Sequence, residues 1–159
     1  MGFAPASMQL TSPAFKPLGR IPKKHTGDAE DVSPALEWTG APTGTKAFAL
    51  VCHDPDAPLV TPIMYGFTHW VLYNIPGNVS KLAEAERGYT SGVSSFGKPG
   101  YGGPLPPEGH GVHHYYFWLL ALKSDKNLAS GLSIHDLFKA IESHVLGMNR
   151  LIGTYSRPS

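Results

Sequence analysis

The chain has 159 residues, of which 42% are hydrophobic and 16% charged, and its formal net charge at pH 7 is +1. These values are typical of one soluble globular domain with a hydrophobic core, and they argue against a disordered or fibrous chain. No run of lysines and arginines is longer than Lys23-Lys24, so a strongly basic surface is missing and we expect no nucleic-acid partner.

The N-terminal segment has neither the cationic start nor the long apolar stretch of a secretory signal. The longest apolar stretch, FWLLAL at 117–122, is too short to cross a bilayer. We therefore expect a cytoplasmic protein without integral membrane association, built as a single domain over 1–159 with a flexible N-terminal extension at 1–9. Cys52 is the one cysteine, which excludes an intrachain disulfide, and its apolar neighbours predict a buried structural thiol.

The first part of the chain, up to residue 46, is rich in turn-forming residues. Within it, alternation places Leu36 and Trp38 on one face of a short strand at 35–38. KAFALVCHD at 46–54 predicts a strand that is buried on both faces, because its apolar character is continuous. The prolines of DPDAP end this strand.

Two further strands are predicted at 68–76 (THWVLYNIP) and 113–122 (HHYYFWLLAL). Between them, KLAEAER at 81–87 favours one or two helical turns, and 88–111 is almost entirely loop. A helix is predicted over 133–148 from its apolar stripe, with Ser133 and Asp136 as its capping box, and 151–157 predicts a last short strand. The pattern predicts a mostly-β domain with a few peripheral helices.

Polar residues gather where the three confident strands end or begin. Asp54 ends the first strand, His69 begins the second, and alternation places His113 and Tyr115 on one face at the start of the third. If these strands are neighbours in the sheet, the four side chains converge on one pocket. Each of them alone also fits an ordinary structural role, such as a turn, a half-exposed histidine or a core tyrosine.

The elements DPDAP (54–58), HWVLYNIP (69–76) and FGKPGYGGPLPPEGHGVHHYYFWLLAL (96–122) together resemble the phosphatidylethanolamine-binding protein family, and most closely its small prokaryotic Raf-kinase-inhibitor-like branch. The likeness runs from about Leu10 to Arg157. It implies a β-sandwich with a Greek-key central sheet and a small surface cavity for phosphate or a phosphoethanolamine head group. The ligand-binding residues that the resemblance implies are Asp54, Asp56, Pro58, Phe67, His69, Pro106, Pro107, Gly109, His110, His113 and Tyr115.

This chain departs from the common prokaryotic pattern around the rim of that cavity. Gly27 and Leu105 stand where cysteines are frequent, Ser94-Ser95 replaces a more polar pair, and the segment LVTPIMYGF at 59–67 is unusual. These departures bear on the identity of the ligand more than on the existence of the pocket.

The loop before the third strand suggests how such a pocket is made. Its prolines fix φ and remove backbone donors, and its glycines let backbone N–H groups approach a ligand. Asp54 should repel a phosphate, however. Either His69 and His113 are protonated beside it, or Asp54 receives the ammonium of a zwitterionic head group while the imidazoles and Tyr115 hold the phosphate.

Three functions compete at this stage. The first is a binding module for a small anionic or zwitterionic ligand, with a protein kinase or other protein partner and a homodimer implied by resemblance alone. The second is a hydrolase of phosphoesters or small esters, against which stands the absence of an identifiable nucleophile. The third is a zinc site at His53, Asp54, Asp56, His69, His110 and His113, whose separate positions lack compact ligand spacing, so we expect no metal and no cofactor.

Overall fold

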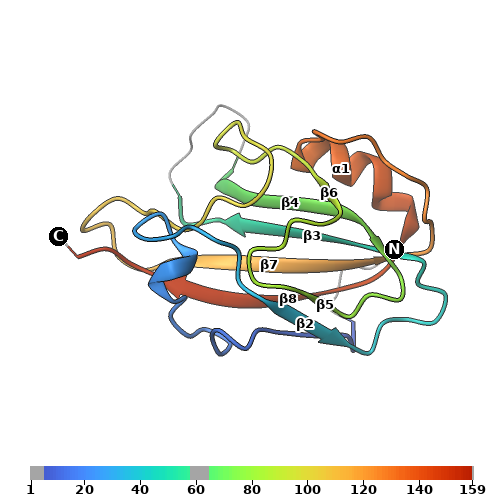
Figure 1. Cartoon of the computed structure of the whole chain (residues 1–159), viewed down its shortest axis with the longest axis horizontal. Helices are drawn as coiled ribbons and strands as arrows, with labels where there is room; N and C mark the ends of the chain where they lie inside the picture. Colours follow the sequence, from blue (N-terminus) through green and yellow to red (C-terminus); the bar gives the residue numbers. More distant parts are fainter. Residues whose placement is uncertain (1–5, 58–64, 159) are drawn as a thin grey trace.

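The computed structural model describes residues 6–57 and 65–158, which form two antiparallel sheets (Figure 1). The smaller sheet has the strand order β1-β2-β5 and the larger one β6-β4-β3-β7-β8. The strands are β1 (Gln9–Thr11), β2 (Leu36–Thr39), β3 (Ala47–Asp54), β4 (Phe67–Pro76), β5 (Lys81–Leu82), β6 (Thr90–Ser91), β7 (His113–Leu122) and β8 (Val145–Tyr155). The mostly-β prediction and its three confident strands are thereby confirmed.

Strand β3 lies at the centre of the larger sheet, between β4 and β7. Alternate residues of β3 enter two separate hydrophobic clusters: Phe48, Leu50 and Cys52 belong to one, and Ala47, Ala49 and Val51 to the other. The prediction that this strand is buried on both faces is confirmed. Cys52 is buried, and that burial raises the pKa of its thiol well above the usual value.

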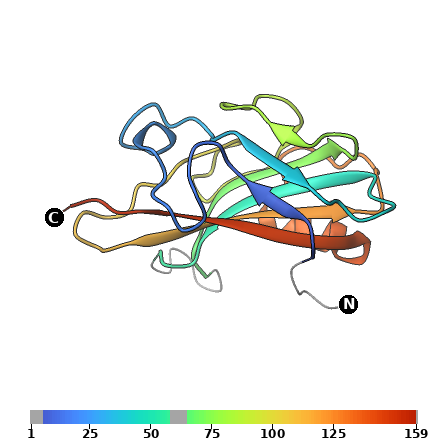
Figure 2. The ribbon, with the colours of Figure 1, turned by 90° about the horizontal axis from the view of Figure 1, so that it is seen from below.

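Different elements cover the two faces of the larger sheet (Figure 2). Leu36 and Trp38 of β2 pack with one cluster, as their predicted common face requires. Leu137 and Ile141 of helix α1 (Ile134–Ile141) pack with the other. A 3-10 turn, η1 (Lys23–His25), lies in the N-terminal part of the chain.

The predicted helix over 133–148 is too long. Ser133 does cap α1, since its side chain accepts a hydrogen bond from the Asp136 amide. After Ile141 comes a 3-10 turn, η2 (Glu142–His144), and residues from Val145 onward pair with β7 along its whole length. The ladder of backbone hydrogen bonds with β7 outweighs the local helical pattern, so β8 begins six residues earlier than the strand predicted at 151–157.

Two other predictions need correction. Residues 81–87 form no helical turn. Leu82 of β5 is buried and pairs with Leu36 of β2, and Ala85 has a left-handed φ of 56°. A flexible extension over 1–9 does not hold for residues 6–9: Met8 is fully buried and Gln9 begins β1. Residues 1–5 lie outside the described part of the chain.

Candidate functional site

The sheet order brings together the strand ends that carry the predicted polar residues. Because β4 and β7 both run antiparallel to β3, the end of β3 lies beside the beginnings of its two neighbours. Asp54 pairs with Phe67 in the β3–β4 register, and His53 pairs with Tyr116 in the β3–β7 register. The juxtaposition predicted for Asp54, His69, His113 and Tyr115 is therefore present.

These four side chains line one cavity of about 210 Å³ at this end of the sheet. Of the other predicted site residues, Phe67, Pro106 and Pro107 also line it. The full lining consists of Asp54, Ala57, Phe67, His69, Phe96, Leu105, Pro106, Pro107, His113 and Tyr115. No lysine or arginine is among these residues, so the cavity combines one carboxylate with mostly apolar walls.

Asp54 and two histidines form a chain of hydrogen bonds. The Asp54 side chain is almost fully buried, and its Oδ2 accepts from Nδ1 of His113 over 2.6 Å. Its Oδ1 accepts from the Asp56 amide over 2.8 Å. On the far side of His113, Nε2 lies 2.7 Å from Nδ1 of His110. A buried carboxylate is thus linked through His113 to an imidazole on the exposed loop, and each His113 nitrogen has a partner.

His69 is held in a single tautomer. Its Nδ1 lies 2.7 Å from the carbonyl oxygen of Gly102, which can only accept, so Nδ1 carries the proton. Burial lowers the pKa of His69 from 6.5 to about 4. The hypothesis that His69 is protonated beside Asp54 is therefore wrong at neutral pH, because removing the ring from water outweighs the attraction of the carboxylate.

Tyr115 contributes a neutral hydroxyl to the cavity. Burial, and then the negative charge of Asp54, raises the pKa of Tyr115 above its ordinary value. Within the described part of the chain, the hydroxyl has no hydrogen-bond partner, which leaves its proton available for a ligand.

Aromatic rings form one wall of the cavity. The Phe67 ring lies 4.8 Å from the His69 ring and 4.7 Å from the Phe96 ring, measured between centroids. The Tyr115 ring meets His69 edge to face at 5.2 Å. These contacts fix the orientation of His69 by packing as well as by its hydrogen bond.

The loop before β7 builds the opposite wall, though not in the expected way. Pro106 and Pro107 line the cavity, but Gly109 and His110 do not. The Gly109 amide donates to the Arg157 carbonyl and the His110 amide to the Pro107 carbonyl. Gly109 has a φ of 72°, so its role is to turn the loop. These two amides are therefore not available to a ligand, and the expectation that backbone N–H groups of this loop approach a ligand receives no support from them.

The remaining predicted site residues are Asp56 and Pro58. The Asp56 carboxylate points away from the cavity and accepts hydrogen bonds from the amide and Nδ1 of His114, at 2.8 and 2.7 Å. Asp56 therefore acts on the cavity through its backbone amide, which binds Asp54. Pro58 lies outside the described residues.

Ala57, Phe96 and Leu105 line the cavity and were missing from the predicted site. Ala57 stands inside the DPDAP motif and Leu105 stands between two prolines of the loop before β7, so the sequence could have indicated both positions. Phe96 lies far away in a glycine-rich loop, and only the fold places it here. Leu105 also contacts Gly27: a Cβ added at Gly27 would lie 3.2 Å from the Leu105 Cβ, so two of the departing positions touch.

Across residues 6–57 and 65–158, no three His, Cys, Asp or Glu side chains lie close enough together to hold a metal ion. The proposed zinc ligands are divided between the cavity, the exposed loop and the outer face of β3. Over the same residues, no helix combines the length and the apolar character needed to cross a membrane.

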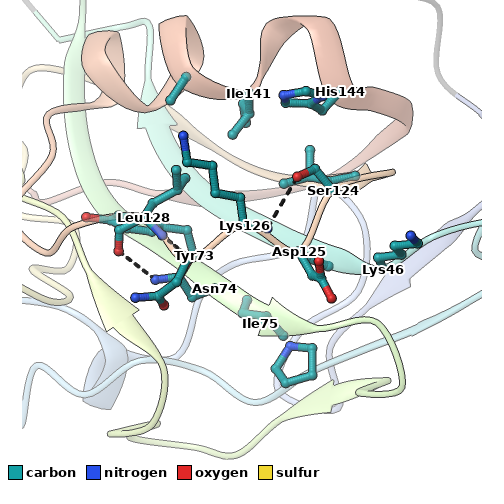
Figure 3. Close-up of a pocket in the computed structure, with 15 residues that line it drawn as sticks. Lys46, Tyr73, Asn74, Ile75, Ser124, Asp125, Lys126, Leu128, Ile141 and His144 are labelled. Atoms are coloured by element: carbon teal, nitrogen blue, oxygen red, sulfur yellow. Dashed lines mark hydrogen bonds between the residues drawn. The ribbon is translucent and has the colours of Figure 1, made fainter.

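A larger cavity of about 420 Å³ lies at the opposite end of the sheet, between α1 and the segment 124–128 (Figure 3). Its lysines, Lys46 and Lys126, are exposed. The polar groups of its floor already have protein partners: Asn74 exchanges hydrogen bonds with the Leu128 backbone, and the Tyr73 hydroxyl donates to a carbonyl of the following loop. These groups hold the loop in place, so we take the smaller cavity as the candidate site.

Comparison with known proteins gives a consistent result. The family model described as phosphatidylethanolamine-binding protein matches residues 11–156. A UPF0098 protein from Methanothermobacter thermautotrophicus is 43% identical over 157 residues, which cover 94% of this chain and 99% of that protein.

Two solved bacterial structures are also similar. A putative phosphatidylethanolamine-binding protein homologue from Chlamydia trachomatis is 34% identical with a TM-score of 0.87, covering 94% of this chain and 97% of the other. YbcL from E. coli, described as a new member of the mammalian family, is 31% identical with a TM-score of 0.86, covering 95% and 99%.

Proposed function

Because the chain belongs to the phosphatidylethanolamine-binding protein family, we propose that its cavity binds a small phosphoryl compound, such as the phosphoethanolamine head group of a lipid or its free counterpart. One observation carries the proposal: Asp54, His69, His113 and Tyr115, from three strands, line a single cavity. Ligand sites are typically apolar hollows in which a few polar groups converge. At about 210 Å³ the volume suits a head group rather than a whole lipid.

The phosphoryl end suits this cavity better than the ammonium end. Both oxygens of Asp54 already accept a hydrogen bond from the protein, so much of the carboxylate's charge is compensated locally. The Tyr115 hydroxyl can donate to a phosphoryl oxygen, whereas an ammonium group could use only its oxygen as an acceptor. His113 lines the same cavity and is linked to His110 on the loop.

A cavity-filling variant tests this function. Leu105→Trp puts a large side chain where an exposed leucine lines the cavity, and we expect binding of phosphoethanolamine, measured by isothermal titration calorimetry, to weaken at least tenfold. Leu146→Trp is the matched control, since Leu146 is comparably exposed, at 38%, and does not line the cavity. Equal affinity of both variants for phosphoethanolamine would contradict the proposed site, as would no binding to the unmodified protein.

The proposal extends to protein partners. Trp118, Phe138 and Met148 line an apolar groove of about 450 Å³ on the outer face of the larger sheet, and Tyr65 beside them is 69% exposed. Exposed apolar patches of this kind are typical of protein–protein contacts. We propose this face for a homodimer, and for contact with a kinase or other signalling enzyme of the cytoplasm.

The hydrolase alternative has one observation in its favour, the 2.6 Å contact between Asp54 and His113. A carboxylate that orients an imidazole is a common arrangement for a general base. However, the other nitrogen of His113 is bound to His110, and among residues 6–57 and 65–158 no serine, threonine or cysteine lines the cavity. Turnover of a phosphomonoester that is lost in His113→Ala would favour hydrolysis over binding alone.

A further inference from the structure

We infer that the cavity selects a ligand that brings its own proton: the phosphoryl group binds as the monoanion, and its P–O–H donates a hydrogen bond to Nε2 of His69. The Tyr115 hydroxyl donates to another phosphoryl oxygen. This inference rests on the proposed function and defines which ionic form of the ligand is bound.

The tautomer of His69 is the first step. A neutral imidazole has one N–H, and the Gly102 carbonyl, 2.7 Å from Nδ1, requires it to be on that nitrogen. Nε2 therefore has a lone pair and can only accept. Among the described residues it has no hydrogen-bond partner, while the ring itself lines the cavity. A ligand must supply the hydrogen for this bond.

The balance of donors and acceptors is the second step. Pro106 and Pro107 have no N–H, and the amides of Gly109 and His110 are used within the loop. On the cavity wall the Tyr115 hydroxyl is the clear donor, and the His69 nitrogen is the unpaired acceptor. A phosphoryl dianion or a sulfate can only accept, so it would cover Nε2 of His69 and exclude water from it without giving it a hydrogen bond, which costs free energy.

Charge is the third step. Within the part of the chain that the structure describes, the cavity wall holds the Asp54 carboxylate and no lysine or arginine. Two hydrogen bonds compensate part of the charge of this carboxylate, and the repulsion that remains grows with the charge of the ligand and is poorly screened by salt. The monoanion is repelled less than the dianion, so charge and hydrogen bonding favour the same ionic form.

In any pH experiment, protonation of the ligand must be distinguished from protonation of the titratable groups near the cavity. Asp54 and Asp31 raise the pKa of His69, and His53 lowers it, but burial dominates and keeps this imidazole neutral at pH 5 and above. Tyr115 stays protonated. His113 lines the same cavity and contacts His110, so the ligand series must also distinguish the ligand's proton from these two imidazoles.

A series of ligands with different second pKa values distinguishes protonation of the ligand from protonation of the protein. Affinities of the unmodified protein for inorganic phosphate, phosphoethanolamine and methylphosphonate are measured by calorimetry from pH 5 to 8. We expect each affinity to fall about tenfold per pH unit above the ligand's own second pKa, near 6 for phosphate monoesters. The midpoint of the fall should move with the ligand's pKa, and sulfate should bind at least tenfold more weakly than phosphate at pH 6.

Three results would overturn the inference. One midpoint shared by all ligands would place the proton on a protein histidine. Sulfate binding as tightly as phosphate would show that no ligand proton is needed. Ethanolamine competing for the site while phosphate does not would place an ammonium there. No binding of any phosphoryl compound would contradict the proposed function itself.

Variants provide a second readout. His69→Gln replaces the acceptor by an amide that can also donate. We therefore expect the slope of log affinity for phosphoethanolamine against pH, above pH 6, to become at least threefold smaller. Tyr115→Phe should weaken binding about tenfold at every pH without changing the slope. His114 does not line the cavity, so His114→Gln is the control and should leave both the affinity and the slope of its pH dependence unchanged. An unchanged slope in folded His69→Gln would overturn the assignment, and if that variant does not fold, the ligand series decides.

Discussion

At the level of single residues, the environment of each polar group explains its role in the cavity. Asp54 is buried, and the cost of burying its carboxyl group is offset by two N–H donors, one to each oxygen. His69 is equally buried, and its burial lowers its pKa more than the hydrogen bond to the Gly102 carbonyl raises it, so the ring stays neutral. The cost of burial is therefore offset by two N–H donors at Asp54 but outweighs the hydrogen bond at His69.

His69 should make the protein less stable in acid. Its pKa is about 4 in the folded state against 6.5 when unfolded, so between these values the unfolded chain binds a proton that the folded protein does not. The contribution is complete above pH 6.5 and lost as the pH falls toward 4, by up to about 3 kcal/mol. Urea unfolding at pH 7 and 4.5 measures it.

The comparison variant for that experiment is His69→Gln, which has no titrating group at this position. We expect the drop in unfolding free energy from pH 7 to 4.5 to be smaller in this variant. An identical drop in both proteins would show that His69 is protonated in the folded state more easily than its burial indicates.

At the level of elements, the sequence pattern predicts a strand correctly where the strand is long and its residues are buried throughout. Strands β3, β4 and β7 were predicted because their apolar patterns agree with their pairing. The boundary between α1 and β8 was missed because Val145 fits both a helical stripe and the ladder with β7. The four central site residues followed from strand ends, whereas Phe96 reaches the cavity from a loop whose path no periodicity encodes.

Asn74 in β4 holds the loop that follows β7 through its side chain. It has a left-handed φ of 57°, and its side chain bonds to Thr90 and to both backbone groups of Leu128. Asn74→Ala removes these bonds and leaves alanine in an unfavourable conformation, so we expect a loss of about 3 kcal/mol in unfolding free energy. Chemical denaturation measures this loss.

Asn127→Ala is the control for this prediction, because Asn127 is exposed and lines the same large cavity. We expect it to change stability by less than about 0.5 kcal/mol. Affinity for phosphoethanolamine should stay unchanged in both variants, since the proposed site lies at the other end of β3. Equal stability of the two variants would mean that the hydrogen bonds of Asn74 contribute little.

At the level of the whole molecule, the two faces of the larger sheet are covered unequally. The smaller sheet closes one face, while α1 covers only part of the other (Figure 2). The uncovered part carries Tyr116 and Trp118, stacked at 6.5 Å, with Arg150 lying 5.3 Å from the Trp118 ring. Tryptophan, tyrosine and arginine are the residues that most often dominate binding at protein interfaces.

We expect this face to bind a second copy of the chain. Phe138, at 40% exposure beside it, is a suitable probe: Phe138→Glu should shift the protein from dimer to monomer in sedimentation velocity experiments. Leu18→Glu, at an exposed position with 62% accessibility that does not line the groove, should leave the dimer intact. An unmodified protein that is monomeric at all concentrations tested would contradict the homodimer.

The contact between Gly27 and Leu105 gives the cavity an adjustable wall. Any side chain at position 27 would press on Leu105, whose methyl groups lie only 3.1 and 3.2 Å from the position of an added Cβ. Position 27 does not line the cavity, yet its size would set how far Leu105 leans inward. A protein with this architecture can therefore change which molecules fit by exchanging one residue behind the wall, while every group that touches the ligand stays the same.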